Sequence, residues 1–204
     1  EDGTPEWLRK QSTLHRKIAM TFERQGDYEK ALARLQAAKM VLTESAEGDQ
    51  TELASIFNDI GWTHFRRGNV EIAEQHMMNA LEIVMDSDEY QVIASIYNRL
   101  GGIYFTKNDM DKADFYTRQS LDLREKMGEL ALAARSYNNL GLIAWKRGRL
   151  QDAMKYFERS FETQKELGDI EVLIELNTNL SFLEMEYGRP ELAERYILEA
   201  IEMA

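Results

Sequence analysis

Cysteine is absent from the 204-residue chain, and proline occurs only twice. Without cysteine the protein forms neither a disulfide nor a thiolate metal site, and this composition is typical of a reducing compartment. Proline interrupts helices, so its scarcity favours an almost entirely helical chain. No apolar run approaches the ~18 residues that a membrane span requires. We therefore predict a cytoplasmic protein that does not enter a membrane.

Positive charge is also scarce, because 25 Lys and Arg residues face 36 Asp and Glu residues, a net charge of −11. A protein that follows nucleic-acid phosphates is normally basic, so we predict no nucleic-acid partner. The first five residues do not form a signal peptide. They also lack a starting Met, so we expect a fragment or a processed chain.

Signatures of catalysis are missing as well. His15, His64 and His76 have no partner at the spacing of metal ligands. Neither a Walker-type phosphate loop nor a dinucleotide-binding glycine pattern occurs, and Gly101 and Gly102 fall inside a helical pattern. We predict no enzymatic activity, no cofactor and no metal site.

What the chain does contain is a unit of about 40 residues that recurs along its length. Residues 137–153 match residues 97–113, and related segments lie 40 residues before and after these. Glycine or asparagine follows the first half of each unit, where a left-handed conformation can end a helix. These turn residues are Gly26, Gly68, Asn108, Gly148 and Gly188.

Apolar residues three or four positions apart predict a helix on each side of these turns. The expected helices are 7–24, 28–42, 52–67, 70–85, 89–107, 110–126, 129–147, 150–166, 169–187 and 190–203.

This pattern resembles the tetratricopeptide repeat family, in which a Leu/Gly pair, aromatic residues and alanines recur on a helix–turn–helix. The Leu/Gly pair appears at 60–61, 100–101 and 140–141, and a tightly packed alanine appears as Ala31, Ala73, Ala113, Ala153 and Ala193. The period of 40 exceeds the family's usual length of about 34 residues, so we expect longer helices.

The resemblance implies an all-α fold, a right-handed superhelical solenoid of about five hairpins whose concave groove is lined by the first helices. We expect an N-terminal tail at residues 1–4 and a single array at 5–204. Its repeats are expected near 5–46, 50–87, 88–127, 128–167 and 168–204. Gly61, Gly101 and Gly141 are expected to permit close packing within a hairpin, with the alanine twelve residues later facing each glycine.

In that family, positions three residues before the glycine project into the groove, and here they include Asn58, Asn98 and Asn138. Helical spacing adds an apolar group to the same stripe, namely Trp62, Phe65, Phe105, Leu142, Trp145 and Phe182. Amides can pair with the backbone of an extended peptide, and aromatic residues can bury its side chains. Another interpretation stays open, in which the amides bond to neighbouring helices and the tryptophans pack between hairpins.

Arg66 and Arg135 add positive charge near this stripe, and such cations could attract an acidic segment or a C-terminal carboxylate. Arginine is also favoured at helix C-termini by the helix dipole, and we favour that interpretation for Arg67 and Arg147.

The repeat also resembles arrays in large bacterial signalling proteins. This resemblance implies a scaffold or sensor module that binds a peptide or protein segment. The alternatives are self-association through repeat ends, including a homo-oligomer formed through the C-terminal repeat, and control of an attached ATPase, cyclase or DNA-binding domain. No polar capping helix follows residues 190–203, so we expect further repeats or a second copy there.

Overall fold

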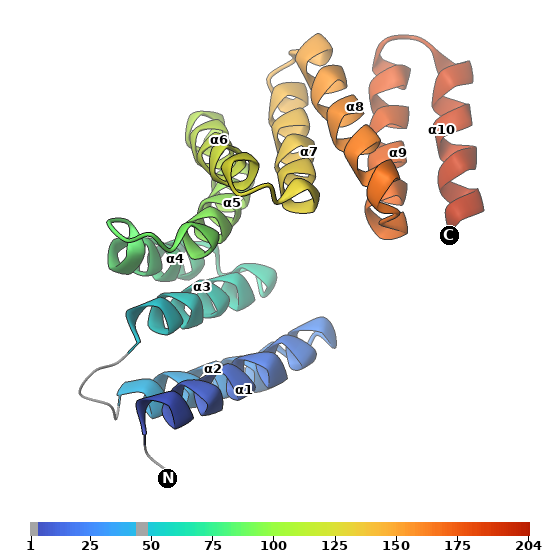
Figure 1. The fold of residues 1–204 in the computed structure, drawn as a ribbon. Helices are drawn as coiled ribbons and strands as arrows, with labels where there is room; N and C mark the ends of the chain where they lie inside the picture. Colours follow the sequence, from blue (N-terminus) through green and yellow to red (C-terminus); the bar gives the residue numbers. More distant parts are fainter. Residues whose placement is uncertain (1–3, 44–48) are drawn as a thin grey trace. The chain divides into compact units, whose positions relative to one another are not determined.

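The computed structural model describes residues 4–43 and 49–204, in which helices alternate with short turns (Figure 1). These two ranges contain ten helices and no strand, so the predicted all-α repeat architecture is confirmed. The helices are α1 (Pro5–Arg24), α2 (Tyr28–Thr43), α3 (Gln50–Arg66), α4 (Val70–Val84), α5 (Tyr90–Thr106), α6 (Met110–Lys126), α7 (Leu130–Lys146), α8 (Leu150–Leu167), α9 (Ile170–Glu186) and α10 (Pro190–Met203).

The expected helix limits lie within about two residues of these bounds, a deviation typical of helix ends. Residues 1–3 of the expected tail, and 44–48 of the connection between the first two repeats, lie outside the described residues. Thr4 begins α1, because its hydroxyl accepts a 3.3 Å hydrogen bond from the Trp7 amide. Asp49 begins α3 in the same way, at 3.0 Å from the Glu52 amide.

The turns inside the hairpins have the predicted left-handed residues. Asn108 has a φ of 60° and is the one non-glycine residue with positive φ in the described ranges. Asparagine tolerates this conformation because its short amide can bond locally. The other turns have glycine there, at Gly26, Gly68, Gly148 and Gly188.

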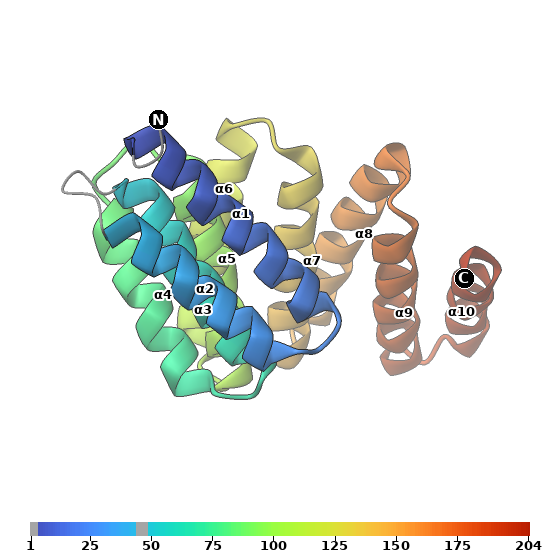
Figure 2. The same cartoon turned by 90° about the horizontal axis from the view of Figure 1, so that it is seen from below.

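The chain forms two compact units, Glu1–Ile103 and Tyr104–Ala204. In unit 1, α1 packs on α2, α3 packs on α4, and α2 contacts α3 (Figure 2). Its core includes Leu35, Leu42 and Ile56, all almost fully buried. Burial of such apolar surface between successive hairpins is what stabilises a repeat array.

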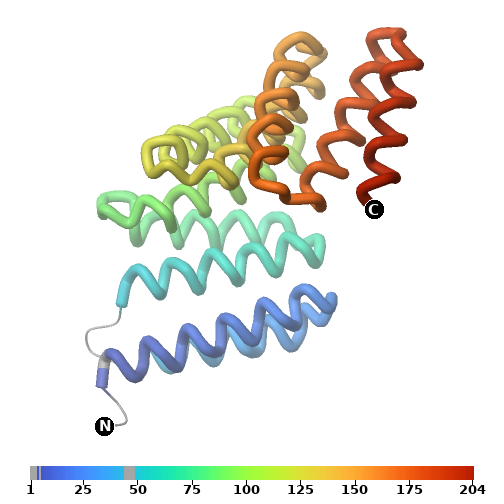
Figure 3. The backbone as a smooth tube through the Cα atoms, turned by 45° about the vertical axis from the view of Figure 1, so that its right-hand side comes forward, coloured from blue at the N-terminus to red at the C-terminus, as the bar shows by residue number. Residues whose placement is uncertain are grey.

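In unit 2, α7 packs on α8 and α9 on α10, while α6 contacts α7 and α8 contacts α9 (Figure 3). Its core surrounds Phe157, which is fully buried and clusters with Leu176, Leu180 and Leu183. The five alanines of the repeat pattern are buried in both units, between 0% and 3% exposed.

Close helix packing is confirmed at Gly61 and Gly141. A Cβ atom added at Gly141 would lie 2.5 Å from the ring of Phe157. At Gly61 it would lie 2.9 Å from the Met77 side chain and 3.0 Å from the carbonyl oxygen of Ala73. The nearest side chain is therefore the one sixteen residues later, whereas the sequence suggested the alanine twelve residues later.

Gly141 and Gly102 form a matched pair for testing this contact. Both lie inside helices, but a Cβ atom at Gly102 would meet nothing within 4 Å. We expect Gly141→Ala to lower the free energy of unfolding by roughly 1–3 kcal/mol through overpacking. Gly102→Ala should raise it by up to about 1 kcal/mol, because alanine favours the helix. Urea denaturation measures both, and equal effects of the two substitutions would contradict the packing role of Gly141.

Candidate functional site

Each unit has what we call a first-helix face. It is the surface formed on the first helices by side chains from nine residues before to five residues after the repeat glycine, whose position Ala19 takes in α1 and Ser181 in α9. The helices that form it are α1, α3 and α5 in unit 1, and α7 and α9, with the end of α5, in unit 2. The predicted site residues of unit 1 are Asn58, Trp62, Phe65, Arg66 and Asn98. Those of unit 2 are Phe105, Arg135, Asn138, Leu142, Trp145 and Phe182.

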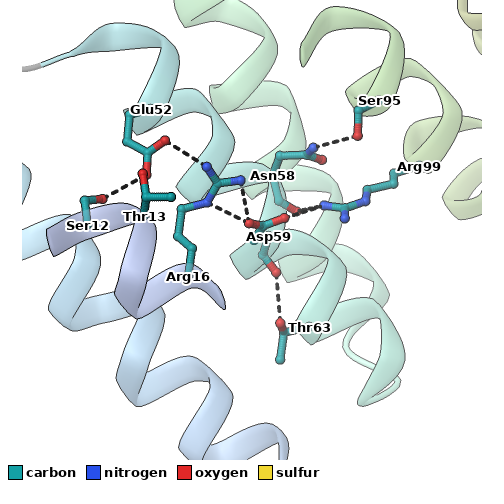
Figure 4. A network of polar contacts seen from close by, with 9 residues as sticks. All are labelled: Ser12, Thr13, Arg16, Glu52, Asn58, Asp59, Thr63, Ser95 and Arg99. Carbon is teal, nitrogen blue, oxygen red and sulfur yellow. Dashed lines mark hydrogen bonds and ion pairs between the residues drawn. The ribbon is translucent and has the colours of Figure 1, made fainter. Parts of the chain in front are cut away.

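The first-helix face of unit 1 contains a network of ion pairs (Figure 4). Arg16 of α1 donates to Glu52 at 2.8 Å and to Asp59 at 2.9 Å, and both carboxylates belong to α3. Arg99 of α5 donates to the other oxygen of Asp59 at 3.0 Å. Ser12 adds a hydrogen bond to Glu52 at 3.1 Å. The network therefore joins three successive first helices.

The charges of this network cancel, because two guanidinium groups face two carboxylates. Glu52 is 8% exposed and Asp59 14% exposed, so the pairs are well removed from water. Burial disfavours the charge of Arg16, but the carboxylates of Asp59 and Glu52 outweigh this effect and raise the pKa of its guanidinium. An acidic ligand would have to displace these internal carboxylates.

Aromatic rings lie beside the network. The guanidinium of Arg99 lies 5.2 Å from the ring centre of Trp62, within the range of a cation–π contact. The Trp62 ring in turn stacks on Phe65, with 5.3 Å between ring centres. In unit 1 the predicted aromatic residues therefore pack against each other and against an arginine of the protein itself.

Asn58 and Asn138 bond to neighbouring first helices. The amide nitrogen of Asn58 donates to Ser95 at 3.2 Å, and that of Asn138 donates to Glu175 at 2.8 Å. Asn138 also accepts a 3.0 Å hydrogen bond from Asn179. Asn58 and Asn138 are buried, while Asn98 is half-buried. These contacts correspond to the interpretation left open above, and capture of a peptide backbone by the amides stays a prediction.

Unit 2 has a cavity on its first-helix face. Phe105, Leu142, Trp145, Lys146 and Glu186 line a volume of about 420 Å³. This size lies within the range of about 300–1,000 Å³ that is usual for ligand pockets. The structure thus brings together three of the predicted site residues, Phe105, Leu142 and Trp145.

Further apolar surface adjoins Trp145. Its ring stacks on Phe182 of α9, with 6.2 Å between centres and 24° between planes. Phe182 is nevertheless 54% exposed, and Met185, one turn further along the helix, is 57% exposed. Large apolar side chains that remain accessible beside a pocket are a usual feature of protein-binding sites.

The predicted cationic residues have partners within the protein. Arg66 lies 3.6 Å from Glu23, and Arg135 lies 3.5 Å from Asp169. Both arginines are about half exposed, at 47% and 54%, so these pairs are only weakly stabilising.

Sequence reasoning missed the carboxylates Glu52, Asp59 and Glu186, whereas Lys146 belonged to the cations that could attract an acidic segment. The sequence does contain a signal for Asp59 and Glu186, because residues of opposite charge stand 40 positions apart, at equivalent places in successive repeats. Asp59 and Arg99 are 40 residues apart and form an ion pair, and Lys146 and Glu186 are 40 residues apart and line one cavity.

Across residues 4–43 and 49–204, no three His, Cys, Asp or Glu side chains gather as metal ligands would. In the same part of the chain, no helix combines the length and the apolar character needed to cross a membrane.

Successive helical hairpins that stack on one another are the defining feature of a helical-repeat protein. In this chain the two helices of a hairpin approach closely at a glycine, and the first helices of unit 2 border a pocket of ligand size. The sequence profile of the tetratricopeptide repeat matches residues 10–86, 52–126, 92–166 and 132–204. The chain therefore belongs to the tetratricopeptide repeat family. No curated protein sequence matches it significantly.

Solved structures share this fold at low sequence identity. BtubC (BKLC) from P. vanneervenii has a TM-score of 0.86 and 21% identity, over 98% of this chain and 82% of that one. A Rap conjugation gene regulator of plasmid pLS20, solved with a Phr peptide, has a TM-score of 0.79 and 21% identity over 93% of this chain. This chain spans 52% of that regulator. MamA from Desulfovibrio magneticus RS-1 has a TM-score of 0.64 and 16% identity, over 95% of this chain and 94% of that one.

The ion-pair network gives a direct test in unit 1. Asp59→Asn keeps the side chain's size but leaves Arg16 and Arg99 without their shared carboxylate. We expect the free energy of unfolding to fall by about 1–3 kcal/mol. Lys10→Met, which breaks the exposed pair between Lys10 and Glu6, serves as the control and should cause no measurable change. Similar urea midpoints for the two variants would contradict a stabilising role of the network.

Proposed function

We propose that the chain binds a peptide, or an extended segment of a protein, on the first-helix face of unit 2. The observation that carries this proposal is the cavity bordered by Phe105, Leu142 and Trp145. A large apolar side chain of the ligand would enter it and displace water from these three residues. Burial of one such side chain contributes roughly 1.5–3 kcal/mol, enough to anchor a short segment.

The surroundings of the cavity support an extended ligand more than a small compact one. Phe182 and Met185 continue the apolar surface along α9 beyond the cavity itself. Asn138 and Glu175 lie one to two turns earlier on the same stripes and carry polar atoms that could exchange their mutual hydrogen bond for bonds to a peptide backbone. The Rap regulator, a protein of this fold solved in complex with a peptide, supports a ligand of this class.

Unit 1 is the less favourable surface for the same ligand. Its charges are satisfied internally by the network of Arg16, Glu52, Asp59 and Arg99. The ring of Trp62 stacks on Phe65 and contacts the guanidinium of Arg99. A ligand would have to replace contacts that the unit already makes, and this lowers the net gain on binding.

Substitution of the cavity residues tests the proposal. A peptide selected from a random displayed library on the wild-type chain serves as the probe. We expect Trp145→Ala to weaken its binding at least tenfold, because a central aromatic residue typically contributes 2 kcal/mol or more. Phe115→Ala removes a 55% exposed ring on α6 and should leave affinity unchanged. Calorimetric titration that shows equal affinity for both variants would contradict the site.

Self-association through the C-terminal repeat is a second proposal, favoured by one observation. α10 exposes Leu198 at 53% and Ile201 at 64%. If these side chains pack against another copy, sedimentation velocity should show larger species at higher concentration. Ile201→Glu should then abolish them, whereas Ile72→Glu on α4 should not. A single monomeric species at all concentrations would contradict this proposal.

A role within a larger signalling protein, as a sensor for an attached catalytic or DNA-binding domain, stays a prediction.

A further inference from the structure

The cavity of unit 2 has two charged residues at its rim, and they have opposite signs. Lys146 ends α7 and Glu186 ends α9, and both line the cavity together with Trp145. They occupy equivalent places in successive repeats, because they are 40 residues apart. Both side chains are exposed. The apolar interior is therefore bordered by a cation from one first helix and a carboxylate from the next.

Neither charge has an ion-pair partner among the described residues. Arg135 pairs with Asp169, and Arg147, which directly follows Lys146, pairs with Asp111. By contrast, within residues 4–43 and 49–204 neither Lys146 nor Glu186 takes part in an ion pair, with each other or with a third residue. Two opposite charges beside an apolar cavity are thus available to a ligand.

We infer that the ligand of this site is bipolar, with a large apolar side chain flanked by an acidic group on one side and a basic group on the other. This inference rests on the proposed function. The apolar side chain enters the cavity, the acidic group of the ligand meets Lys146, and its basic group meets Glu186. A uniformly acidic ligand would place one of its charges against Glu186, and a uniformly basic one would place a charge against Lys146.

The net charge of −11 alone would favour a different ligand from the bipolar one. A long-range field of that sign favours the most basic ligand, whatever its arrangement of charges. The two rim residues act only over the short distances of contact, since exposed charges more than about 8 Å apart are largely screened at physiological salt. A preference for the bipolar ligand would therefore indicate contact with Lys146 and Glu186, whereas a preference for the basic ligand would indicate attraction by the net negative charge of the chain.

Three synthetic peptides with blocked ends test the inference on the full chain. Each has a central Leu-Trp-Leu, flanked by two acidic and two basic residues, by acidic residues on both sides, or by basic residues on both sides. The bipolar peptide should bind about two- to fivefold more tightly than either of the others, the effect expected for exposed charge pairs. A ranking that follows positive charge alone, with the basic peptide tightest, would overturn the inference.

Variants of the rim sharpen the test. Lys146→Glu should make the basic peptide the tightest ligand, and Glu186→Lys should make the acidic peptide the tightest. The double exchange K146E/E186K has the net charge of the wild-type chain but reverses the rim. It should restore the preference for a bipolar peptide, with the acidic and basic flanks of that peptide in the opposite order. Lys155→Glu, on the exposed side of α8, is the control and should leave the ranking unchanged. A double exchange that fails to restore the bipolar preference would overturn the inference.

Failure of the proposed function gives a different result from failure of this inference. If Trp145→Ala leaves binding of all three peptides unchanged, or if none of them binds, the cavity is not the site and both proposals fall. If Trp145→Ala weakens all three but the ranking ignores Lys146 and Glu186, the site stands and only the bipolar preference is wrong.

Discussion

The contact between a glycine of one helix and a bulky side chain of the next is the constraint on which the rest of the structure depends. At Gly141 the backbone lies so close to Phe157 that no Cβ atom fits, and at Gly61 Met77 occupies the corresponding place. These contacts bring the two helices of a hairpin together along one stripe of the first helix. The first-helix face of each unit lies on a different stripe of the same helices.

The two units use that face differently. In unit 1, Arg16, Glu52, Asp59 and Arg99 connect three first helices through ion pairs that are largely shielded from water. Removing charges from water is unfavourable, and such a network is tolerated only when its hydrogen bonds are satisfied, as they are here. In unit 2 the corresponding surface presents Trp145 and Leu142 at a cavity, and Phe182 stacks on Trp145. Within the described part of the chain, the charged residues that line this cavity form no ion pair. The same repeat pattern thus gives a surface whose charges pair with each other in unit 1 and a surface with an accessible cavity in unit 2.

Sequence periodicity predicted the hairpins, the turn residues and the buried alanines because each depends on contacts within one repeat. The partners of the polar residues were not predictable in this way. Asn58 bonds to Ser95, and Asp59 bonds to Arg16 and Arg99, so these partners lie 37 to 43 residues away on neighbouring helices. Spacing places an asparagine on a stripe but does not decide whether its amide meets a ligand or the next helix. Glu186 was not predictable from the repeat, because the repeat is defined by like residues at equivalent positions, whereas the cavity combines unlike residues there.

The three tryptophans of the chain allow the difference between the two faces to be measured directly. In a Trp7→Phe/Trp62→Phe variant, Trp145 alone reports on unit 2, and in a Trp7→Phe/Trp145→Phe variant, Trp62 alone reports on unit 1. With saturating amounts of a library-selected peptide, the fluorescence of Trp145 should shift to shorter wavelength as its surroundings lose water, while that of Trp62 should stay unchanged. A shift of Trp62 without a shift of Trp145 would contradict the assignment of ligand binding to unit 2.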